Sequence, residues 1–282
     1  MPRLSGPKPR CAAALRHLNN DIFLSVESLD FGYTDRLVLK NIDMRFRRGS
    51  VVALMGGSGC GKTTVLRLIG ALLKPRRGRV VLDGVDVHSL DREGLLAARR
   101  KIGMLFQHGA LFTDLTVHEN IAFPLREHTD LPEPMIRDLV LMKLHAVGLR
   151  GAANLMPSQI SGGMARRVAL ARSIALDPPL LMYDEPFAGL DPISLGTIAH
   201  LIRNLNEALG ATTLVVTHDV AETFAIVDYA YVMSAGEVIG EGTPKELMAS
   251  TDPQVAQFLN GRRDGPVRFH YPAPPMAEEL GL

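Results

Sequence analysis

Long apolar runs are missing from the 282-residue sequence, whose longest apolar stretches, such as Val51–Met55, have the length of a single strand. A helix that crosses a bilayer needs about 20 predominantly apolar residues. We therefore expect no membrane-spanning helix. If the chain acts at a membrane, we expect it to dock onto another subunit.

Cysteine is scarce, and so is charge of one sign. Two cysteines, Cys11 and Cys60, cannot build a disulfide framework, which favours a reducing compartment such as the cytosol. The 31 Lys and Arg nearly balance the 30 Asp and Glu, so the formal net charge is +1. Nucleic-acid-binding domains usually carry a strong basic excess. We therefore expect no nucleic-acid partner.

A secretory signal is also lacking, because the apolar stretch Cys11–Leu15 is too short to be one. Residues 1–21 are locally basic, with no acidic residue before Asp21. We expect a disordered basic leader over 1–21. Contact of this leader with anionic lipid headgroups is the alternative.

The patterns that are present alternate between strand and helix. Apolar runs predict strands within 22–52 and at Val51–Met55, Arg79–Leu82, Leu180–Tyr183, Thr213–Val216 and Tyr229–Met233. Helical periodicity appears at Thr63–Leu73, across a lobe from Leu111 to Pro157 with turn signals at Pro124, Pro132 and Pro134, and at Ala165–Ala175, Leu195–Leu209 and Val220–Ile226. This alternation predicts a parallel α/β sheet. After Asn260 the chain is proline-rich, which excludes a regular helix.

A glycine-rich loop lies between the strand at 51–55 and the helix that starts near 63. It fits the pattern G-x-x-x-x-G-K-[S/T] and consists of Gly56, Gly57, Ser58, Gly59, Cys60, Gly61, Lys62 and Thr63. Its backbone N–H groups can converge on phosphate oxygens, and the helix N-terminus adds its positive end. Lys62 is placed to neutralise the β- and γ-phosphates, and the Thr63 hydroxyl to bind Mg²⁺. An incidental glycine-rich turn is the alternative, which the flanking strand and helix disfavour.

Two carboxylates, Asp184 and Glu185, follow the apolar strand that starts at Leu180. The carboxyl ends of parallel strands are where such folds bind ligands. We expect Asp184 to reach Mg²⁺ and Glu185 to polarise the attacking water. A solvated turn is the alternative for the pair taken alone. With the phosphate loop upstream, the pair favours a nucleotide-hydrolysing site.

The segment before this strand resembles a known family signature. Residues 160–167 read Ile-Ser-Gly-Gly-Met-Ala-Arg-Arg and are followed by an Ala-x-Ala-Arg-x-x-Ala run that ends at Ala175. This is similar to the signature of ABC ATPases, usually Leu-Ser-Gly-Gly-Gln. Met164 replaces the glutamine; because the phosphate-facing groups are backbone amides and Ser161, we expect ATP hydrolysis to survive. The resemblance implies an α/β P-loop NTPase fold of the ABC ATPase type over 22–246. It further implies an N-terminal antiparallel β subdomain and a helical subdomain inserted at about 108–160.

The same resemblance implies roles for further residues. Tyr33 would stack on adenine, Gln107 would be the Q-loop glutamine, and His218 the switch histidine that contacts the γ-phosphate. Ordinary packing is the alternative for Tyr33, a merely polar residue at a strand end for Gln107, and a satisfied surface histidine for His218. The implied catalytic residues are Glu185, His218, Lys62 and Gln107, and the implied Mg²⁺ ligands Thr63, Gln107 and Asp184. ATP would be bound by Tyr33, the loop from Gly56 to Thr63, Thr64, Ser161, Gly162, Gly163 and the D-loop residue Asp191.

A homodimer is part of this expectation. Ser161, Gly162 and Gly163 form a second anion site at a helix N-terminus, yet they cannot plausibly share a phosphate with Lys62 of their own chain. In the family these residues complete the site of a facing subunit, so that two ATP molecules lie between two chains. A symmetric dimer that ATP closes follows from this arrangement.

Longer stretches resemble the ATPases of MCE-linked Mla phospholipid transporters. They are residues 106–115, 124–129, 161–167 and 257–261, followed by 264–267. By this resemblance the chain would move phospholipids between bacterial inner and outer membranes, which maintains outer-membrane lipid asymmetry. It would work from the cytoplasmic face of the inner membrane. Its partners would be an integral membrane permease, a periplasmic MCE-domain protein and a small STAS-domain protein.

Two surfaces are candidates for these contacts. Ala110, Leu111, Phe112 and Leu115 form an apolar group suited to a cytoplasmic helix of the permease. Ordinary core of the helical lobe is the alternative for this group. The extension 247–282 is expected to lie across the second subunit as a dimer clasp, with Phe269 and Tyr271 in its proline-rich part. A disordered tail is the competing interpretation.

Other functions of ABC ATPases fit the sequence less well. A DNA-repair or condensation ATPase would need a long coiled-coil insertion between Gln107 and Ser161, and the interval shows no sustained heptads. A translation-factor ATPase would carry two nucleotide cassettes in one chain. An importer of another small solute is the runner-up, because the ATPase motifs are nearly independent of the cargo.

Overall fold

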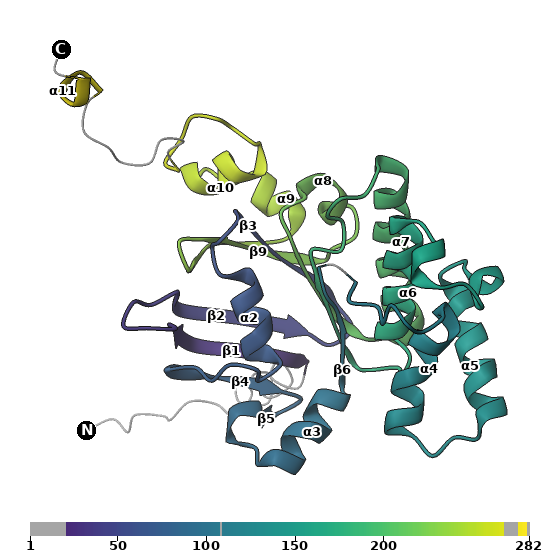
Figure 1. Cartoon of the computed structure of the whole chain (residues 1–282). Helices are drawn as coiled ribbons and strands as arrows, with labels where there is room; N and C mark the ends of the chain where they lie inside the picture. The colour runs from purple at the N-terminus through teal and green to yellow at the C-terminus, as the bar shows by residue number, and fades with distance from the viewer. Residues whose placement is uncertain (1–20, 108, 268–275, 281–282) are drawn as a thin grey trace, which may run out of the picture.

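The computed structural model describes residues 21–107, 109–267 and 276–280. Almost all of the expected basic leader, and the tail residues Phe269 and Tyr271, therefore lie outside the described residues. Within these ranges no helix has the length and apolar character needed to cross a bilayer. The described chain forms two sheets with helices packed around them (Figure 1).

An antiparallel four-stranded sheet occupies the N-terminal part, as expected. Its order is β2-β1-β4-β5, formed by β1 (Ile22–Phe31), β2 (Leu39–Arg47), β4 (Arg77–Leu82) and β5 (Val85–Asp86). Asp83 and Gly84 connect β4 to β5 with φ angles of 50° and 80°. Positive φ at both turn residues is what a two-residue type I′ hairpin requires. Asp83 and Gly84 therefore form the tight turn of a hairpin.

The second sheet has six strands and holds the nucleotide motifs. Its order is β10-β9-β3-β8-β7-β6, formed by β3 (Val51–Gly56), β6 (Ile102–Leu105), β7 (Leu180–Asp184), β8 (Thr212–Thr217), β9 (Tyr229–Ser234) and β10 (Glu237–Gly242). All its neighbouring strands pair in parallel except β10, which is antiparallel to β9. The parallel α/β prediction is thus confirmed.

Both faces of this sheet are covered at its centre, which explains why a central strand such as β3 is continuously apolar. Along β3, Val51, Ala53 and Met55 face one hydrophobic core, and Val52 and Leu54 face another. The first core packs against the long helices, and the second lies against the antiparallel sheet and α2. Because side chains alternate across a strand, one run of apolar residues supplies both cores.

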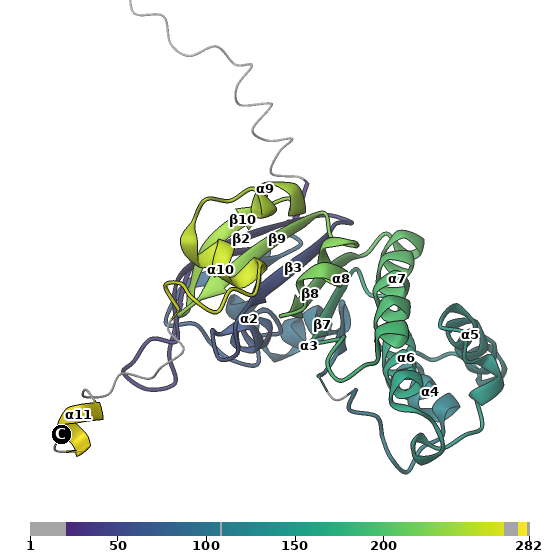
Figure 2. The ribbon, with the colours of Figure 1, turned by 90° about the horizontal axis from the view of Figure 1, so that it is seen from above.

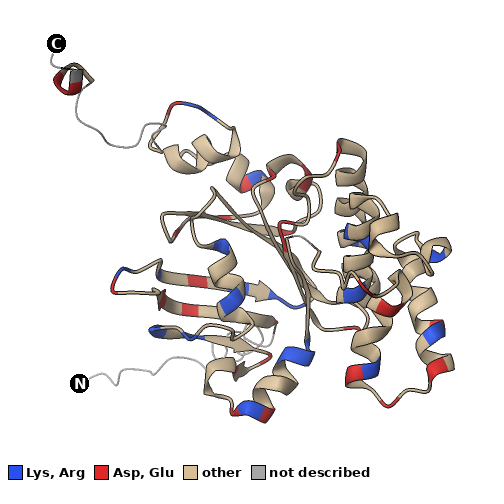
Figure 3. Ribbon diagram, viewed as in Figure 1, with Lys and Arg blue, Asp and Glu red and all other residues tan. Residues whose placement is uncertain are grey.

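The helices divide between two regions in Figure 2. They are α2 (Lys62–Ile69), α3 (Arg92–Arg100), α4 (Val117–His128), α5 (Glu133–Ala146), α6 (Gly162–Ser173), α7 (Pro192–Leu209), α8 (Val220–Phe224), α9 (Pro244–Met248), α10 (Pro253–Leu259) and α11 (Met276–Leu280), with short 3₁₀ turns η1 (Val87–Ser89), η2 (Arg150–Ala152) and η3 (Pro157–Gln159). Helices α4 and α5 lie within the lobe that the helical pattern predicted, and α6, which follows the predicted lobe in the sequence, packs against both. Lys/Arg and Asp/Glu are interspersed over both regions (Figure 3).

Three local predictions were wrong. Helix α2 ends at Ile69 rather than Leu73, because Gly70 caps it and Ala71 takes a φ of 50°. Pro124 lies inside α4 instead of in a turn, and its helix is held by a Thr116 capping box and four core residues. The proline-rich tail contains a short helix, α11, which starts directly after Pro275. In each case the end of an element depends on its surroundings more than on local propensity.

Candidate nucleotide-binding and hydrolysis site

The phosphate loop connects β3 to α2, and its first and last glycines, Gly56 and Gly61, could not be replaced by another residue without strain. Gly56 has a φ of 151°, and an added Cβ would lie 2.4 Å from the carbonyl oxygen of Met233. Gly61 has a φ of 111°, and its Cβ would lie 2.5 Å from a methyl carbon of Leu39. The loop therefore takes this path because glycine permits positive φ and close packing at both ends.

Lys62 lies at the start of α2 with its ammonium group turned back onto the loop. The Nζ atom donates to the carbonyl oxygens of Gly56 at 2.7 Å and Gly57 at 3.1 Å. It also lies 3.7 Å from Oε1 of Glu185, and both side chains are largely buried. A buried cation that faces a helix N-terminus is the arrangement that binds phosphate.

Thr63 and Asp184 come together across the sheet from α2 and β7. The Thr63 hydroxyl donates to Oδ1 of Asp184 at 3.4 Å. Burial raises the pKa of Asp184, and the neighbouring negative charge of Glu185 raises it further. Two adjacent ligands of an octahedral Mg²⁺ ion lie about 3 Å apart and are preferably oxygens. These two oxygens therefore fit one Mg²⁺ ion, whose charge would offset the cost of burying the carboxylate.

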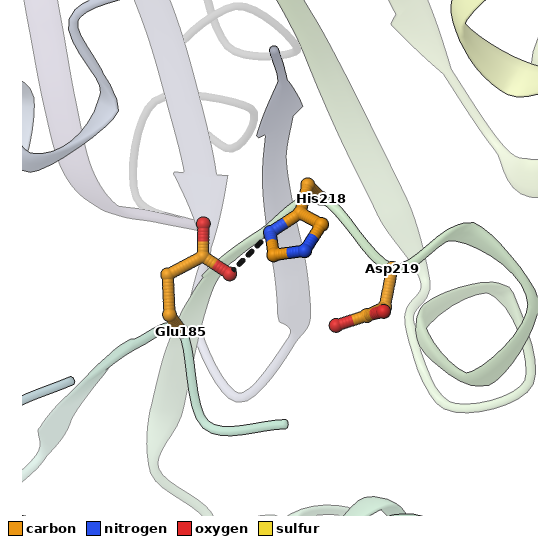
Figure 4. A group of neighbouring side chains, drawn as sticks. All are labelled: Glu185, His218 and Asp219. Carbon is orange, nitrogen blue, oxygen red and sulfur yellow. Dashed lines mark hydrogen bonds and ion pairs between the residues drawn. The ribbon is translucent and has the colours of Figure 1, made fainter. Parts of the chain in front are cut away.

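Glu185, His218 and Asp219 form a cluster at the carboxyl ends of β7 and β8 (Figure 4). His218 Nδ1 lies 2.9 Å from Oε2 of Glu185. Glu185 itself has a φ of 48°, and its N–H donates to the carbonyl of Val216 at 2.8 Å. A non-glycine residue in this region is strained, and such strain gathers at functional sites. The carboxylate is thus held beside both Lys62 and His218, where it can orient a water molecule.

The side chains of Glu185, His218 and Asp219 are of the types that bind cations, and one ligand atom from each lies within 4.8 Å of the others. The Thr63–Asp184 pair offers oxygens alone, which Mg²⁺ prefers to a mixed set with imidazole. Asp219 was not predicted from the sequence. Its position directly after His218 is the signal that could have found it.

Tyr33 and Gln107 are both exposed, so neither is explained by burial in the core. Tyr33 is 57% exposed and packs edge-on against Phe31, with ring centroids 4.9 Å apart. Gln107 follows β6, and its backbone carbonyl accepts a hydrogen bond from Arg166. Among the described residues no hydrogen bond or ion pair joins Tyr33 or the Gln107 side chain to the loop or to Glu185. Their roles toward a nucleotide remain predictions.

The signature residues lie at the N-terminus of α6. The Ser161 hydroxyl caps this helix by accepting from the N–H of Met164 at 3.2 Å. An added Cβ on Gly162 would meet nothing within 4 Å, whereas one on Gly163 would lie 2.9 Å from the Ser194 hydroxyl. The fold of a single chain therefore does not require glycine at 162. An open glycine at an exposed helix N-terminus leaves room for a ligand or another chain to approach.

Asp191 has a role within the chain as the cap of α7. Its carboxylate accepts from the N–H groups of Ile193 at 3.0 Å and Ser194 at 3.1 Å. Hydrogen bonds from Ser194 lower the pKa of Asp191. In the part of the chain that the structure describes, no hydrogen bond or ion pair joins Asp191 or the signature residues to Lys62. One chain thus does not bring all the predicted site residues together.

An apolar groove of about 630 Å³ opens beside the segment that follows β6. Phe106, Ala110, Phe112, Phe123 and Pro124 are among its lining residues. Phe112 and Phe123 stack there with centroids 4.9 Å apart, and each is about two-fifths exposed (40% and 41%). Of the apolar group predicted to receive a partner, Ala110 and Phe112 line the groove. Leu111 packs against the core instead, as the alternative interpretation expected. Docking of a partner at the groove stays a prediction.

Comparisons with known proteins agree with this geometry. The family model described as ABC transporter matches residues 39–188. The chain is 55% identical over 261 residues to the "Intermembrane phospholipid transport system ATP-binding protein MlaF" of Haemophilus influenzae, covering 93% of this chain and 99% of that protein. It is 38% identical over 263 residues to the "Probable ribonucleotide transport ATP-binding protein mkl" of Mycobacterium leprae, covering 93% and 76%. Among solved structures, the dimeric ATP-binding cassette MJ0796 in a post-hydrolysis state with ADP and Pi matches with a TM-score of 0.72. That match has 34% identity and covers 78% of this chain and 98% of the other.

Proposed function

This chain belongs to the ABC transporter family of ATP-binding proteins, and we propose that it is the ATP-hydrolysing subunit of a bacterial inner-membrane transporter that moves phospholipids between the two membranes. The observation that carries the ATPase activity is the convergence of Lys62, Glu185 and His218 beside the phosphate loop. The cargo rests on the 55% identity to a phospholipid-transport ATPase over nearly the whole of both chains.

ATP is bound with its phosphates against the loop from Gly56 to Thr64, where Lys62 supplies the positive charge. Thr63 and Asp184 hold Mg²⁺, with Gln107 as a further ligand. Glu185 takes the proton of the attacking water, and His218, which it contacts, holds the carboxylate and reaches toward the γ-phosphate. Tyr33 is free to stack on adenine because its ring is exposed.

The working unit is a homodimer that encloses two ATP molecules. Ser161, Gly162, Gly163 and Asp191 of one chain complete the site of the facing chain, which accounts for an open glycine at 162 that one chain does not need. The similar cassette MJ0796 is dimeric and holds ADP and Pi. Two copies of each site follow from a two-fold dimer.

The apolar groove receives a cytoplasmic helix of the permease. Two exposed phenylalanine rings, Phe112 and Phe123, offer the kind of surface on which an amphipathic helix docks. The chain thereby sits peripherally on the cytoplasmic face of the inner membrane. A periplasmic MCE-domain protein and a small STAS-domain protein complete the proposed transporter. The proposed division of the chain is an ATPase domain at 22–246, with its helical subdomain at about 108–160, and a C-terminal extension at 247–282.

The experiment that tests the function is affinity purification of the tagged chain from detergent-solubilised membranes. The associated proteins and lipids are identified, and ATPase activity is measured with Lys62→Ala as the inactive control. Recovery of a permease, an MCE protein and phospholipid supports both parts of the proposal. A permease recovered without MCE protein or phospholipid would leave the ATPase and remove the cargo. That result would favour a small-solute transporter, consistent with the different cargo in the name of the mycobacterial relative.

A further inference from the structure

One buried arginine of the signature helix has contacts that the functions described so far do not use. Arg166 lies in the second turn of α6, and only 8% of the residue is exposed. Its Nη1 atom donates to the backbone carbonyls of Phe106, at 3.3 Å, and Gln107. Its Nη2 atom donates to the carbonyl of Ala188 at 3.1 Å. One side chain therefore connects α6 to two other segments of the site.

Burying this guanidinium is costly, and the contacts show what it provides. Among the described residues Arg166 takes part in no ion pair, and burial lowers its pKa. A buried cation balanced by carbonyls alone stabilises a fold less than an apolar side chain of similar size would. The planar guanidinium of Arg166, however, fixes the relative position of several acceptors at once, which neither lysine nor an apolar residue can do.

Arg166 joins the segment that follows β6 to the loop that follows β7. Gln107 lies two residues after the end of β6, and Ala188 lies between Glu185 and Asp191. A second arginine of α6, Arg172, donates to the carbonyl of Gly109 at 2.8 Å. The backbone is thus fastened to α6 both at residues 106–107 and at 109. Any displacement of α6 must carry the two segments with it.

We propose that Arg166 is a positioning residue, which holds Gln107 and the loop from Glu185 to Asp191 in register with the signature helix. Movement of α6, when ATP closes the dimer or a partner docks in the groove, is passed on through Arg166 to the loop after β7, and through Arg166 together with Arg172 to the segment after β6. The inference rests on the proposed function, because it needs Gln107 and Glu185 to act in hydrolysis. Nucleotide binding at Lys62 is independent of it, since Arg166 makes no contact with the phosphate loop among the described residues.

The test compares Arg166→Met with Arg167→Met in the full-length chain. Arg167 is the neighbouring arginine on the same helix, but it donates to the carbonyl of Val147 at 3.2 Å, away from the site. For Arg166→Met we expect the Kd for ATP to stay within about twofold and kcat to fall about tenfold or more. For Arg167→Met both constants should stay within about twofold of the original protein. An unchanged kcat in Arg166→Met, or a parallel loss in both variants, would overturn the proposal.

A double variant separates positioning from general stability. If Arg166 acts through Gln107, then Arg166→Met should add little to the loss already caused by Gln107→Ala. If the losses of kcat in the two single variants multiply in the double variant, and Tm is lowered as well, then Arg166 is structural only and the proposal is rejected. If Arg166→Met does not fold, Arg166→Lys takes its place. Its single ammonium cannot reach both segments, so kcat should still fall, and an unchanged value rejects the proposal.

The original protein and Glu185→Gln are measured alongside these variants. If the original protein does not hydrolyse ATP, the proposed function fails. If it does, and Glu185→Gln does not, then an active Arg166→Met removes the present inference alone.

Discussion

Glu185 contacts Lys62 on one side and His218 on the other, and it is the base of the proposed hydrolysis. Replacement by glutamine keeps the shape of the side chain, but it exchanges one accepting oxygen for a donating NH₂ group and removes the basicity. We expect Glu185→Gln to bind ATP with unchanged affinity and to turn it over at least ~10²-fold more slowly, as loss of a positioned base does. Single-turnover hydrolysis and equilibrium ATP binding measure the two steps. Turnover close to that of the original protein would show that another group is the base.

We expect the buried carboxylate of Asp184 to lower the stability of the fold while it serves hydrolysis. Burial raises its pKa in the folded chain above the ordinary value of 3.8, so folding binds protons in the window between these two values. Stability from this group is therefore lost as the pH rises through that window, and at pH 7 the buried charge destabilises the nucleotide-free protein. We expect Asp184→Asn to raise Tm at pH 7 by a few degrees and to abolish Mg²⁺-dependent hydrolysis.

Asp191→Asn is the control for this prediction. The pKa of Asp191 is lowered by hydrogen bonds from Ser194, the opposite direction, and the residue is fully exposed. Asparagine also caps helices well, so Tm should not rise in this variant. Thermal unfolding at pH 7 and at mildly acidic pH decides the question. The advantage of Asp184→Asn should shrink as the pH falls, and an equal or larger advantage at acidic pH contradicts the prediction.

At the scale of elements, the sequence predicted most strands and helices because their patterns are long and their environment is simple. The run at 51–55 is apolar on both faces, and it becomes a strand covered on both faces. Ends were less predictable. Ile69 ends α2 because Gly70 and Ala71 leave helical geometry, and Pro124 stays helical because its neighbours Ile121 and Leu125 are buried in the core. These outcomes depend on packing that local propensity does not contain.

The candidate site was predictable to a similar degree. Lys62, Asp184 and Glu185 could be named because each follows from a motif at a strand end. Asp219 could have been found from its position directly after His218. The contacts of Arg166 could not, since they join segments far apart in the sequence. The signature residues are a third case, because their ligand would lie on another chain.

Gly162 lies at the start of α6, a helix that packs within its own chain and, by the proposal, also faces the nucleotide of the other chain. A substitution at Gly162 separates these two roles. Alanine at this position meets no atom within 4 Å, and φ is not positive there. Alanine in place of a helical glycine usually stabilises a protein by about 0.5–1 kcal/mol. We expect Gly162→Ala to leave Tm unchanged or slightly raised and to lower ATPase activity about tenfold or more, because the methyl group obstructs the facing nucleotide.

Gly196→Ala in α7 is the matched control, since its added Cβ also meets nothing within 4 Å. It should raise Tm to a similar extent and leave ATPase activity unchanged. Thermal unfolding and steady-state hydrolysis of both variants give the comparison. Full activity in Gly162→Ala would argue against a nucleotide that is sandwiched at this helix terminus.

At the scale of the whole molecule, the C-terminal extension is held against its own chain as far as Val267. The Gln257 side chain holds the backbone of Val267 by two hydrogen bonds, of 2.9 and 2.8 Å. Residues 261–267 thus fold back onto their own chain. Helix α11 stands apart from the rest in Figures 1 and 2, and its Met276 is 75% exposed. A short helix that stands alone is marginal in water and needs a surface to pack on.

The second subunit is the surface that the clasp proposal supplies, and truncation tests it. Removing the residues after Val267 keeps the Gln257 contact and deletes the last part of the proposed clasp, including Phe269 and Tyr271, so the shortened chain should fold with an unchanged Tm. We expect its dimer to dissociate at a higher protein concentration. A clasp that packs on the facing subunit adds a second, tethered contact to the interface, and truncation removes that contact. Sedimentation of Glu185→Gln with ATP, with and without the tail, measures this at constant nucleotide occupancy. Removing the residues after Asn260 serves as the second variant: a loss of Tm confined to this one would assign 261–267 to the fold of a single chain. Equal dimer stability in all three chains would mean that the extension does not hold the dimer together.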